Sequence, residues 1–253
     1  MAVPALIALF AGAFAGSFLT VVAHRVPRKE GFVTGRSRCP RCGAQIAAYD
    51  NVPIVSWLLL RGRCRSCGEP ISARYPVTEA ATGLLWAGTV LALGTDDAGE
   101  LVLGLLLCSV LVAVTLTDLE LRIIPNALVL FGALAGIAVV LVFGLGELDQ
   151  RAIAVAVAGG AFVLIALAYP RGMGMGDAKL VAMMAIYLGR SIAPAVLIGL
   201  LAGSILGLAM IARGGAAARK SAVPFGPFLA LGGVAGLWFG DEIVDWYLDN
   251  FTG

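Results

Sequence analysis

Long hydrophobic runs separated by short polar segments dominate this chain. A helix needs about 20 apolar residues to cross the hydrocarbon core of a bilayer, and most runs approach that length. The pattern predicts about eight transmembrane helices. Their approximate ranges are 3–23, 77–94, 101–118, 124–144, 152–169, 177–189, 192–212 and 225–240, of which the sixth is short. The sequence therefore predicts an all-α polytopic membrane protein.

The composition supports this fold class. Hydrophobic residues make up 60% of the 253 residues, charged residues only 13%, and the mean hydropathy is +0.94. A soluble domain carries about a quarter charged residues. The first run has no positive charge before it, and Arg25, Arg28 and Lys29 follow it, which reverses the order of a signal peptide. We therefore expect residues 1–24 to form a retained first helix with its N-terminus on the outer side.

The distribution of Lys and Arg predicts the orientation of the helices, because short cytoplasmic loops carry the positive excess. Ten of the 18 Lys and Arg residues lie in residues 25–75, and threading eight spans from there places six more on the same side. These six are Arg122, Arg171, Lys179, Arg213, Arg219 and Lys220. Only Arg151 and Arg190 fall opposite, where the loops are acidic. We therefore expect the 25–75 segment to be cytoplasmic.

Two aspartates end or begin predicted helices on that same side. Asp118 ends the third helix, and Asp177 begins the sixth, within the glycine turn Gly174-Met175-Gly176-Asp177. A carboxylate at a membrane boundary is costly, which suggests a functional site. Two carboxylates held together share one proton, so one can activate water while the other polarises a carbonyl, as in aspartic proteases. The pattern predicts that Asp118 and Asp177 form a catalytic pair.

Other interpretations of the aspartates stay open at this level. Asp118 could pair with Arg122 one turn later, and Asp177 could cap its helix after the glycine turn. The two carboxylates could instead relay protons in a transporter, or belong to a non-enzymatic assembly factor. Lys179, two residues beyond Asp177, could orient a substrate or contact lipid headgroups.

The soluble segment contains an internal repeat, because Cys39–Ile46 and Cys64–Ile71 are two copies of C-x2-C-G-x2-I. The two-residue spacing lets both sulfurs of a pair bind one ion. Four thiolates make a closed tetrahedral site, which suits structural zinc. The predicted ligands are Cys39, Cys42, Cys64 and Cys67. Two disulfides are the alternative, but a reducing cytoplasm argues against them.

The same segment is rich in arginine, with seven between Arg36 and Arg74. Such a patch could bind the phosphates of a nucleic acid. Membrane topology already demands positive charge here, however, and anionic lipid headgroups would satisfy it. We therefore expect membrane lipids as partners and no nucleic acid.

Further short motifs follow one another along nearly the whole chain. They are Gly16-Ser17-Phe18-Leu19, His24-Arg25-Val26-Pro27, the two cysteine knuckles, Tyr49-Asp50-Asn51-Val52-Pro53, Ser56-Trp57-Leu58, Arg74-Tyr75-Pro76 with Glu79, Asp118 with Ile124-Pro125, Gly174-Met175-Gly176-Asp177-Ala178-Lys179, and Pro224-Phe225-Gly226-Pro227-Phe228-Leu229-Ala230. In this order they resemble the bacterial type IV prepilin peptidases, which are GxGD-type membrane aspartic proteases.

The resemblance implies that Asp118 and Asp177 are catalytic and that Gly174, Gly176 and Lys179 support them or position the substrate. It implies cleavage of type IV prepilins or type II secretion pseudopilins, after a glycine, at the cytoplasmic face of the bacterial inner membrane. The precursor has a short, positively charged leader followed by a hydrophobic helix.

Many family members also methylate the new N-terminal amine with S-adenosylmethionine, an activity associated with the four-cysteine region. Residues 25–76 would then be a methyltransferase-associated zinc module, and residues 77–253 the peptidase domain. Thr20 stands where the family usually has Asn, and if that Asn serves methyl transfer the chain would be a peptidase with weakened methylation. No residues that bind S-adenosylmethionine can be assigned from the sequence.

Overall fold

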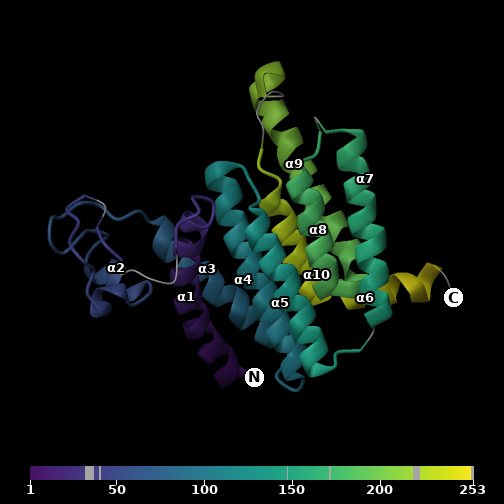
Figure 1. Ribbon diagram of the computed structural model, residues 1–253, viewed down its shortest axis with the longest axis horizontal. Coiled ribbons are helices and arrows are strands. Elements are labelled where there is room, and N and C mark those ends of the chain that lie inside the picture. The colour runs from purple at the N-terminus through teal and green to yellow at the C-terminus, as the bar shows by residue number, and fades with distance from the viewer. Residues whose placement is uncertain (32–36, 40, 147, 171, 219–222, 252–253) are drawn as a thin grey trace. The chain divides into compact units, whose positions relative to one another are not determined.

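The computed structural model describes residues 1–31, 37–39, 41–146, 148–170, 172–218 and 223–251 (Figure 1). Within them the chain is helical apart from loops and two isolated β-bridges, and the longest loops lie in the segment between α1 (Ala2–Arg25) and α3 (Arg74–Leu93). This confirms the predicted all-α fold. The chain divides into two compact units, Met1–Asp96 (unit 1) and Asp97–Gly253 (unit 2), which are described separately.

Seven helical stretches among the described residues are long and apolar enough to cross a membrane. One of them, Met175–Arg213, contains α8 (Met175–Leu188) and most of α9 (Ile192–Ala218), joined by the 3₁₀ turn η3 (Gly189–Ser191). Counted separately, α8 and α9 bring the number of apolar helices to the predicted eight. The 14 residues of α8 span about 21 Å, less than the ~30 Å of the hydrocarbon core, as expected for the short sixth run.

Unit 1 is built on two antiparallel helices, α1 (Ala2–Arg25) and α3 (Arg74–Leu93). Glycines of α1 bring the two backbones close together: a Cβ at Gly16 would lie 2.9 Å from the Cα of Glu79. Small residues four apart let membrane helices pack in this way. The domain boundary predicted near residue 76 stays a prediction, and in the structure α3 belongs to the same unit as α1.

A small module connects α1 to α3 and contains the 3₁₀ turn η1 (Ala48–Asn51) and the short helix α2 (Val55–Leu59). Each of its two cysteine knuckles forms the same pattern of internal backbone hydrogen bonds. The N–H of Gly43 donates to the Cys39 carbonyl, and the N–H of Gly68 donates to the Cys64 carbonyl, both at 2.9 Å. Both glycines have positive φ, 69° and 72°, which other residues rarely adopt. The sequence repeat is therefore also a structural repeat.

Unit 2 is a bundle around α8. Its neighbours are α4 (Ala98–Leu121), α5 (Asn126–Phe143), α7 (Gly160–Ala168), α9 and α10 (Gly226–Phe251) (Figure 1). Because α8 is surrounded, Leu180, Val181 and Met184 are completely buried. A further helix, α6 (Leu148–Ala154), continues into α7 through the five-residue π-helix η2 (Val155–Gly159).

The two ends of unit 2 carry different charges. At the end where α4 stops and α5, α8 and α10 begin, Arg122 and Lys179 are exposed. At the opposite end Arg151 pairs with Glu100 at 2.8 Å, and Arg190 pairs with Asp241 at 3.0 Å. Which end faces the cytoplasm stays a prediction. Of the basic residues used for that prediction, Arg36, Arg171, Arg219 and Lys220 lie outside the described residues.

Candidate functional site

Asp118 lies in the last turn of α4 and is only 6% exposed. Its Oδ2 accepts a hydrogen bond of 2.8 Å from the backbone N–H of Gly226, the first residue of α10. Such N–H groups have no partner within their own helix and carry partial positive charge. A side chain at position 226 would not fit, because a Cβ there would lie 2.7 Å from Asp118 Oδ2. The start of α10 therefore holds the Asp118 carboxylate.

Asp177 lies in the first turn of α8, three residues after Gly174, and is half-buried. Its carboxylate interacts with the backbone N–H of Gly174 and, electrostatically, with Asp118. Gly176 faces Ile124, because a Cβ at position 176 would lie 3.1 Å from the Ile124 Cβ. The loop that follows Asp118 thus packs on the turn that carries Asp177. The structure brings the two predicted residues into one site, and their catalytic role stays a prediction.

The alternative interpretations of the aspartates can be compared with this geometry. No ion pair joins Asp118 to Arg122 in the part of the chain that the structure describes, because the carboxylate turns to Gly226 instead. Asp177 does reach the N–H of Gly174, as a residue that caps a helix from its third position would. Capping explains Asp177 alone and gives no reason for a buried Asp118 at the same end.

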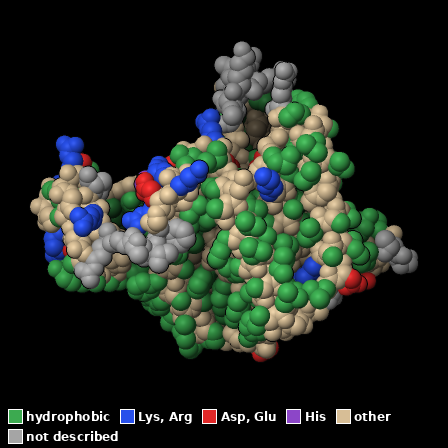
Figure 2. Space-filling view, in the orientation of Figure 1, with side chains coloured by type: hydrophobic (Ala, Val, Ile, Leu, Met, Phe, Trp, Pro, Cys, Tyr) green, Lys and Arg blue, Asp and Glu red, His purple; other side chains and the backbone are tan. Residues whose placement is uncertain are grey.

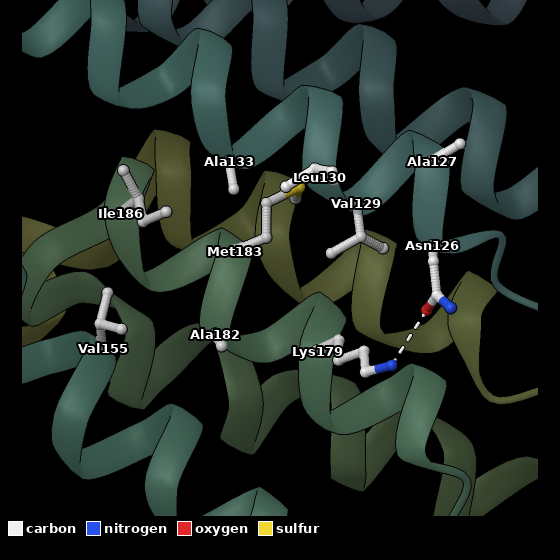
Figure 3. Close-up of a pocket in the computed structure, with 10 residues that line it drawn as sticks. All are labelled: Asn126, Ala127, Val129, Leu130, Ala133, Val155, Lys179, Ala182, Met183 and Ile186. Atoms are coloured by element: carbon white, nitrogen blue, oxygen red, sulfur yellow. Dashed lines mark hydrogen bonds between the residues drawn. The ribbon is translucent and has the colours of Figure 1, made fainter.

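Lys179 lies on α8 at the end of an apolar groove of about 460 Å³ (Figure 3). Its Nζ donates a hydrogen bond of 3.0 Å to Oδ1 of Asn126, the first residue of α5. Two residues correspond to about 200° of rotation on an α-helix, so Lys179 and Asp177 point to opposite sides of α8. In Figure 3 the rest of the groove is lined by apolar side chains of α5 and α8, with Val155 of η2. Lys179 therefore ties α8 to α5 beside the aspartates.

The four predicted metal ligands converge in unit 1. The sulfurs of Cys39, Cys42, Cys64 and Cys67 all lie within 4.8 Å of one another, and none of these cysteines forms a disulfide. The Sγ atoms of Cys39 and Cys67 are 3.8 Å apart although the residues are 28 positions apart in the sequence. This donor set fits one metal ion and speaks against the disulfide alternative.

The surroundings of the cluster favour a thiolate at Cys39 and disfavour one at Cys67. The backbone N–H groups of Cys42 and Arg41 lower the pKa of the Cys39 thiol to about 7. The pKa of Cys67 rises to about 12 although Glu69 N–H donates to it, because burial and the neighbouring thiols oppose a second negative charge. A bound cation would remove that opposition, since metal ligands are thiolates.

Sequence reasoning missed two partners that the structure shows. The first is the Gly226 N–H on Asp118, 108 residues away in the sequence. The second is Glu79 of α3, whose Oε2 accepts a hydrogen bond of 2.7 Å from Ile54 N–H in the cysteine module. Gly226 and Glu79 both belong to motifs that carried the family resemblance, which was the available signal. No role for either residue could be predicted from the sequence.

Comparison with known proteins places both units in described families. Residues 10–93 match the bacterial peptidase A24 N-terminal domain, and residues 105–212 match the type IV leader peptidase family. No solved structure matches the chain.

Curated relatives cover most of the chain. A prepilin leader peptidase/N-methyltransferase from Aeromonas hydrophila is 37% identical over 93% of this chain and 91% of its own length. The corresponding protein from Pseudomonas aeruginosa is 36% identical over 96% and 92%, and one from Burkholderia pseudomallei (strain 1026b) is 36% identical over 92% and 84%.

The fold and the site define a class: polytopic helical membrane proteins with paired aspartates at one end of a bundle and a four-cysteine module that could hold a metal ion. Together with the matches across both units, this confirms the resemblance seen in the sequence. The chain belongs to the bacterial type IV leader peptidase family.

Proposed function

We propose that this chain is a membrane aspartic endopeptidase that removes the leader from type IV prepilins or type II secretion pseudopilins and then methylates the new N-terminal amine. The observation that carries the peptidase assignment is the convergence of Asp118 and Asp177 at one end of unit 2. Membership of a family of prepilin leader peptidase/N-methyltransferases supports both activities.

In the proposed reaction Asp118 acts as the ionised carboxylate, because the Gly226 N–H supports negative charge on its Oδ2. It takes a proton from water as the water oxygen attacks the scissile carbonyl carbon. Asp177, protonated, gives its proton to the carbonyl oxygen, so a neutral tetrahedral diol forms. The C–N bond then breaks as Asp118 returns its proton to the leaving amine. A diol hydroxyl reprotonates Asp177, which restores the pair.

We also propose that the aspartate end of unit 2 faces the cytoplasm of the bacterial inner membrane. Sixteen of the 18 Lys and Arg residues fall on that side in the threaded topology. The hydrophobic helix of a precursor in the bilayer would then place its cytoplasmic end at the depth of the aspartates. Membrane lipids surround the enzyme in this arrangement.

The metal that we propose for the cysteine cluster is structural zinc. Zn–S bonds of about 2.3 Å place neighbouring sulfurs of a tetrahedron about 3.8 Å apart. The Cys39 and Cys67 sulfurs have that separation. Four cysteine ligands leave no open position for a substrate, so the ion would stabilise a module too small to hold a large core.

For the methylation we propose the region 25–76 as the associated module and S-adenosylmethionine as the methyl donor. This cofactor supplies an electrophilic methyl group, which the free N-terminal amine can accept with loss of a proton. Thr20 stands where the family usually has Asn, and its Oγ1 donates to the Ser17 carbonyl at 2.6 Å within α1. That hydroxyl is thus engaged by its own helix, and methylation would be weakened if the family's Asn serves methyl transfer.

Mass spectrometry of a prepilin-like substrate tests both activities. Wild-type enzyme reconstituted in lipid should remove the leader, and the product should gain a methyl group only when S-adenosylmethionine is present. Asp118→Asn and Asp177→Asn should each abolish cleavage, because an amide can neither accept the proton from water nor donate one to the carbonyl oxygen as a carboxyl group does. Asp149→Asn, an exposed aspartate at the start of α6, is the matched control and should cleave normally.

Cleavage by a folded Asp118→Asn or Asp177→Asn enzyme would refute the catalytic pair. If a folded, zinc-loaded wild type cleaves no prepilin-like substrate, while either Asn change alters ion coupling, the transporter interpretation would replace the peptidase.

A further inference from the structure

The short helix α2 presents an exposed apolar face. Val55, Leu58 and Leu59 are 51%, 61% and 78% exposed. Residues three and four apart lie on the same side of a helix, so these three form one surface, here called the α2 face. Exposed apolar residues are common singly, whereas a contiguous group on so small a module marks an interaction surface.

The opposite side of α2 is fixed by hydrogen bonds. Ser56 is buried, and its Oγ donates to the Tyr49 carbonyl at 2.9 Å and accepts from the Val52 N–H at 3.1 Å. Trp57 Nε1 donates to the Ile71 carbonyl at 3.0 Å. The α2 face is therefore held outward by a rigid base and is not exposed by fraying of the helix.

A strained turn sets the direction of α2. Ile54, just before the helix, has φ 61° and ψ −52°, and the Val55 N–H donates to the Pro53 carbonyl at 2.6 Å. These angles define a γ-turn with positive φ at its central residue, which is rarer and more strained than the inverse γ-turn. Ile54 is β-branched, and such residues disfavour positive φ. Glu79, only 7% exposed on α3, accepts from the Ile54 N–H and holds the turn. Strain persists only where the surroundings impose it, so the membrane-spanning helix α3 determines where α2 points.

Basic side chains accompany the α2 face. Arg61 and Arg63 follow α2 directly and are exposed, as are Arg38 and Arg41 on the first knuckle. The acidic Asp50 is neutralised by Arg65, which pairs with it at 2.6 Å. Figure 2 shows the lobe of unit 1 that contains the module with hydrophobic side chains along its lower edge and basic side chains on other sides. Apolar anchors with basic neighbours are typical of segments that lie on a membrane surface.

We propose that the α2 face binds the surface of an anionic bilayer. Val55, Leu58 and Leu59 enter the boundary between headgroups and acyl chains, and the neighbouring arginines contact the anionic headgroups. The chain enters the module from α1 and leaves it through α3, and both helices are candidate membrane spans. The module is therefore always close to a bilayer surface. Besides the attachment through α1 and α3, the short helix α2 thus holds the cysteine module against the membrane surface. This binding is independent of peptidase activity.

Charge selects lipid among the occupants that could cover this face. The leader implied by the family resemblance is positively charged, so Arg61 and Arg63 would repel it, whereas they attract anionic headgroups. A second possible occupant is a surface of unit 2, which the experiment distinguishes by the mass of what is captured.

Photo-crosslinking of the full-length, zinc-loaded protein in lipid nanodiscs tests the proposal. A benzophenone amino acid is placed at position 59 and, in a control protein, at position 66, because Ser66 is exposed on the second knuckle. Position 59 should yield several-fold more phospholipid adduct than position 66. Its yield should fall several-fold in discs made only of zwitterionic lipid. Equal lipid labelling at both positions, or capture of a unit 2 peptide or of added prepilin in place of lipid, would overturn the proposal.

A charge variant supplies a second readout. With the benzophenone at position 58, Leu59→Glu should reduce the lipid adduct several-fold, because a carboxylate resists insertion and is repelled by anionic headgroups. Ser66→Glu, measured with the same probe, should leave it unchanged. Unaltered zinc content shows that each variant retains a folded module. An undiminished adduct in the zinc-loaded Leu59→Glu protein would contradict insertion of the α2 face.

Discussion

At the scale of single residues, the two aspartates have unlike partners. The buried Asp118 is bound by a backbone N–H from another helix, whereas the half-buried Asp177 interacts with the N–H of its own turn. A donor on a separate helix fixes the carboxylate only while that helix stays docked. The start of α10 is therefore part of the site, although it contributes no side chain to it.

Replacing Gly226 with alanine should damage the site without unfolding the protein. The added Cβ would lie 2.7 Å from Asp118 Oδ2, so either the carboxylate or α10 must shift. Displacements of about 1 Å in a catalytic group cost about 10²-fold in rate. We expect leader cleavage to fall by about that factor, measured by the mass spectrometric assay.

The matched control for this prediction is Gly207→Ala in α9. A Cβ there meets no atom within 4 Å, so cleavage should match the wild type and the thermal stability should not fall. Normal cleavage by the folded Gly226→Ala enzyme would show that the Gly226 contact does not position Asp118.

The residue scale also shows where sequence reasoning stops. The residue types and positions of Asp118, Asp177 and the four cysteines predicted which side chains would come together. Carboxylates at the boundary of a membrane helix and cysteines in paired C-x2-C repeats usually indicate a site. The Gly226 N–H carries no side-chain signal at all. A backbone donor that acts across 108 residues becomes visible only when the helices are placed.

At the scale of elements, the segments that carry the aspartates are joined twice. Gly176 packs on Ile124 in the loop after α4, and Lys179 donates to Asn126 at the start of α5. Lys179 points away from Asp177, so its hydrogen bond holds α8 against α5 without involving the Asp177 carboxylate. We expect Lys179 to position the site rather than to take part in proton transfer.

This expectation predicts non-additive effects of two substitutions. Lys179→Met and Asn126→Ala each break the same hydrogen bond, so each should lower kcat by about tenfold as the aspartate segments loosen. The double variant should be no worse than either single one, with KM nearly unchanged in all three. Effects on kcat that multiply, or a rise confined to KM, would show that Lys179 acts on the substrate instead.

Local sequence patterns predicted the individual helices and turns well, but they did not predict which elements contact one another. The two C-x2-C-G-x2-I copies became two identical knuckles, since each repeat contains all the residues that its turn requires. Glycines four apart in α1 allow a close helix contact, but nothing in the local sequence says that the contact is with α3. The turn at Ile54 contradicts the backbone preference of its residue type, and the distant Glu79 holds it through a hydrogen bond that the local sequence does not indicate.

At the scale of the whole molecule, the two candidate sites lie in different units. The cysteine cluster belongs to Met1–Asp96, and both aspartates belong to Asp97–Gly253. Each unit also matches its own family, which suits two activities that can be lost separately. The chemistry agrees with this division, because amide hydrolysis by two carboxylates requires no metal and a closed four-thiolate site offers no position for a substrate.

Removing the metal should therefore separate the two activities. The metal can be removed by chelation or by the double change Cys42→Ser and Cys64→Ser. Without it, the Cys67 thiol is held protonated by burial and by its neighbouring thiols, and the module has little hydrophobic core to stabilise it. Methylation should fall by at least about tenfold, and the 25–76 segment should become sensitive to protease, as small metal-stabilised modules do without their ion. Leader removal should keep most of its rate, because Asp118, Asp177 and Gly226 all lie in unit 2. Ser66→Ala, between two ligands but not one itself, should change neither activity. If cleavage is lost together with the metal while the helices of unit 2 remain folded, the cysteine module must act in proteolysis itself, most simply by presenting the substrate to the aspartates.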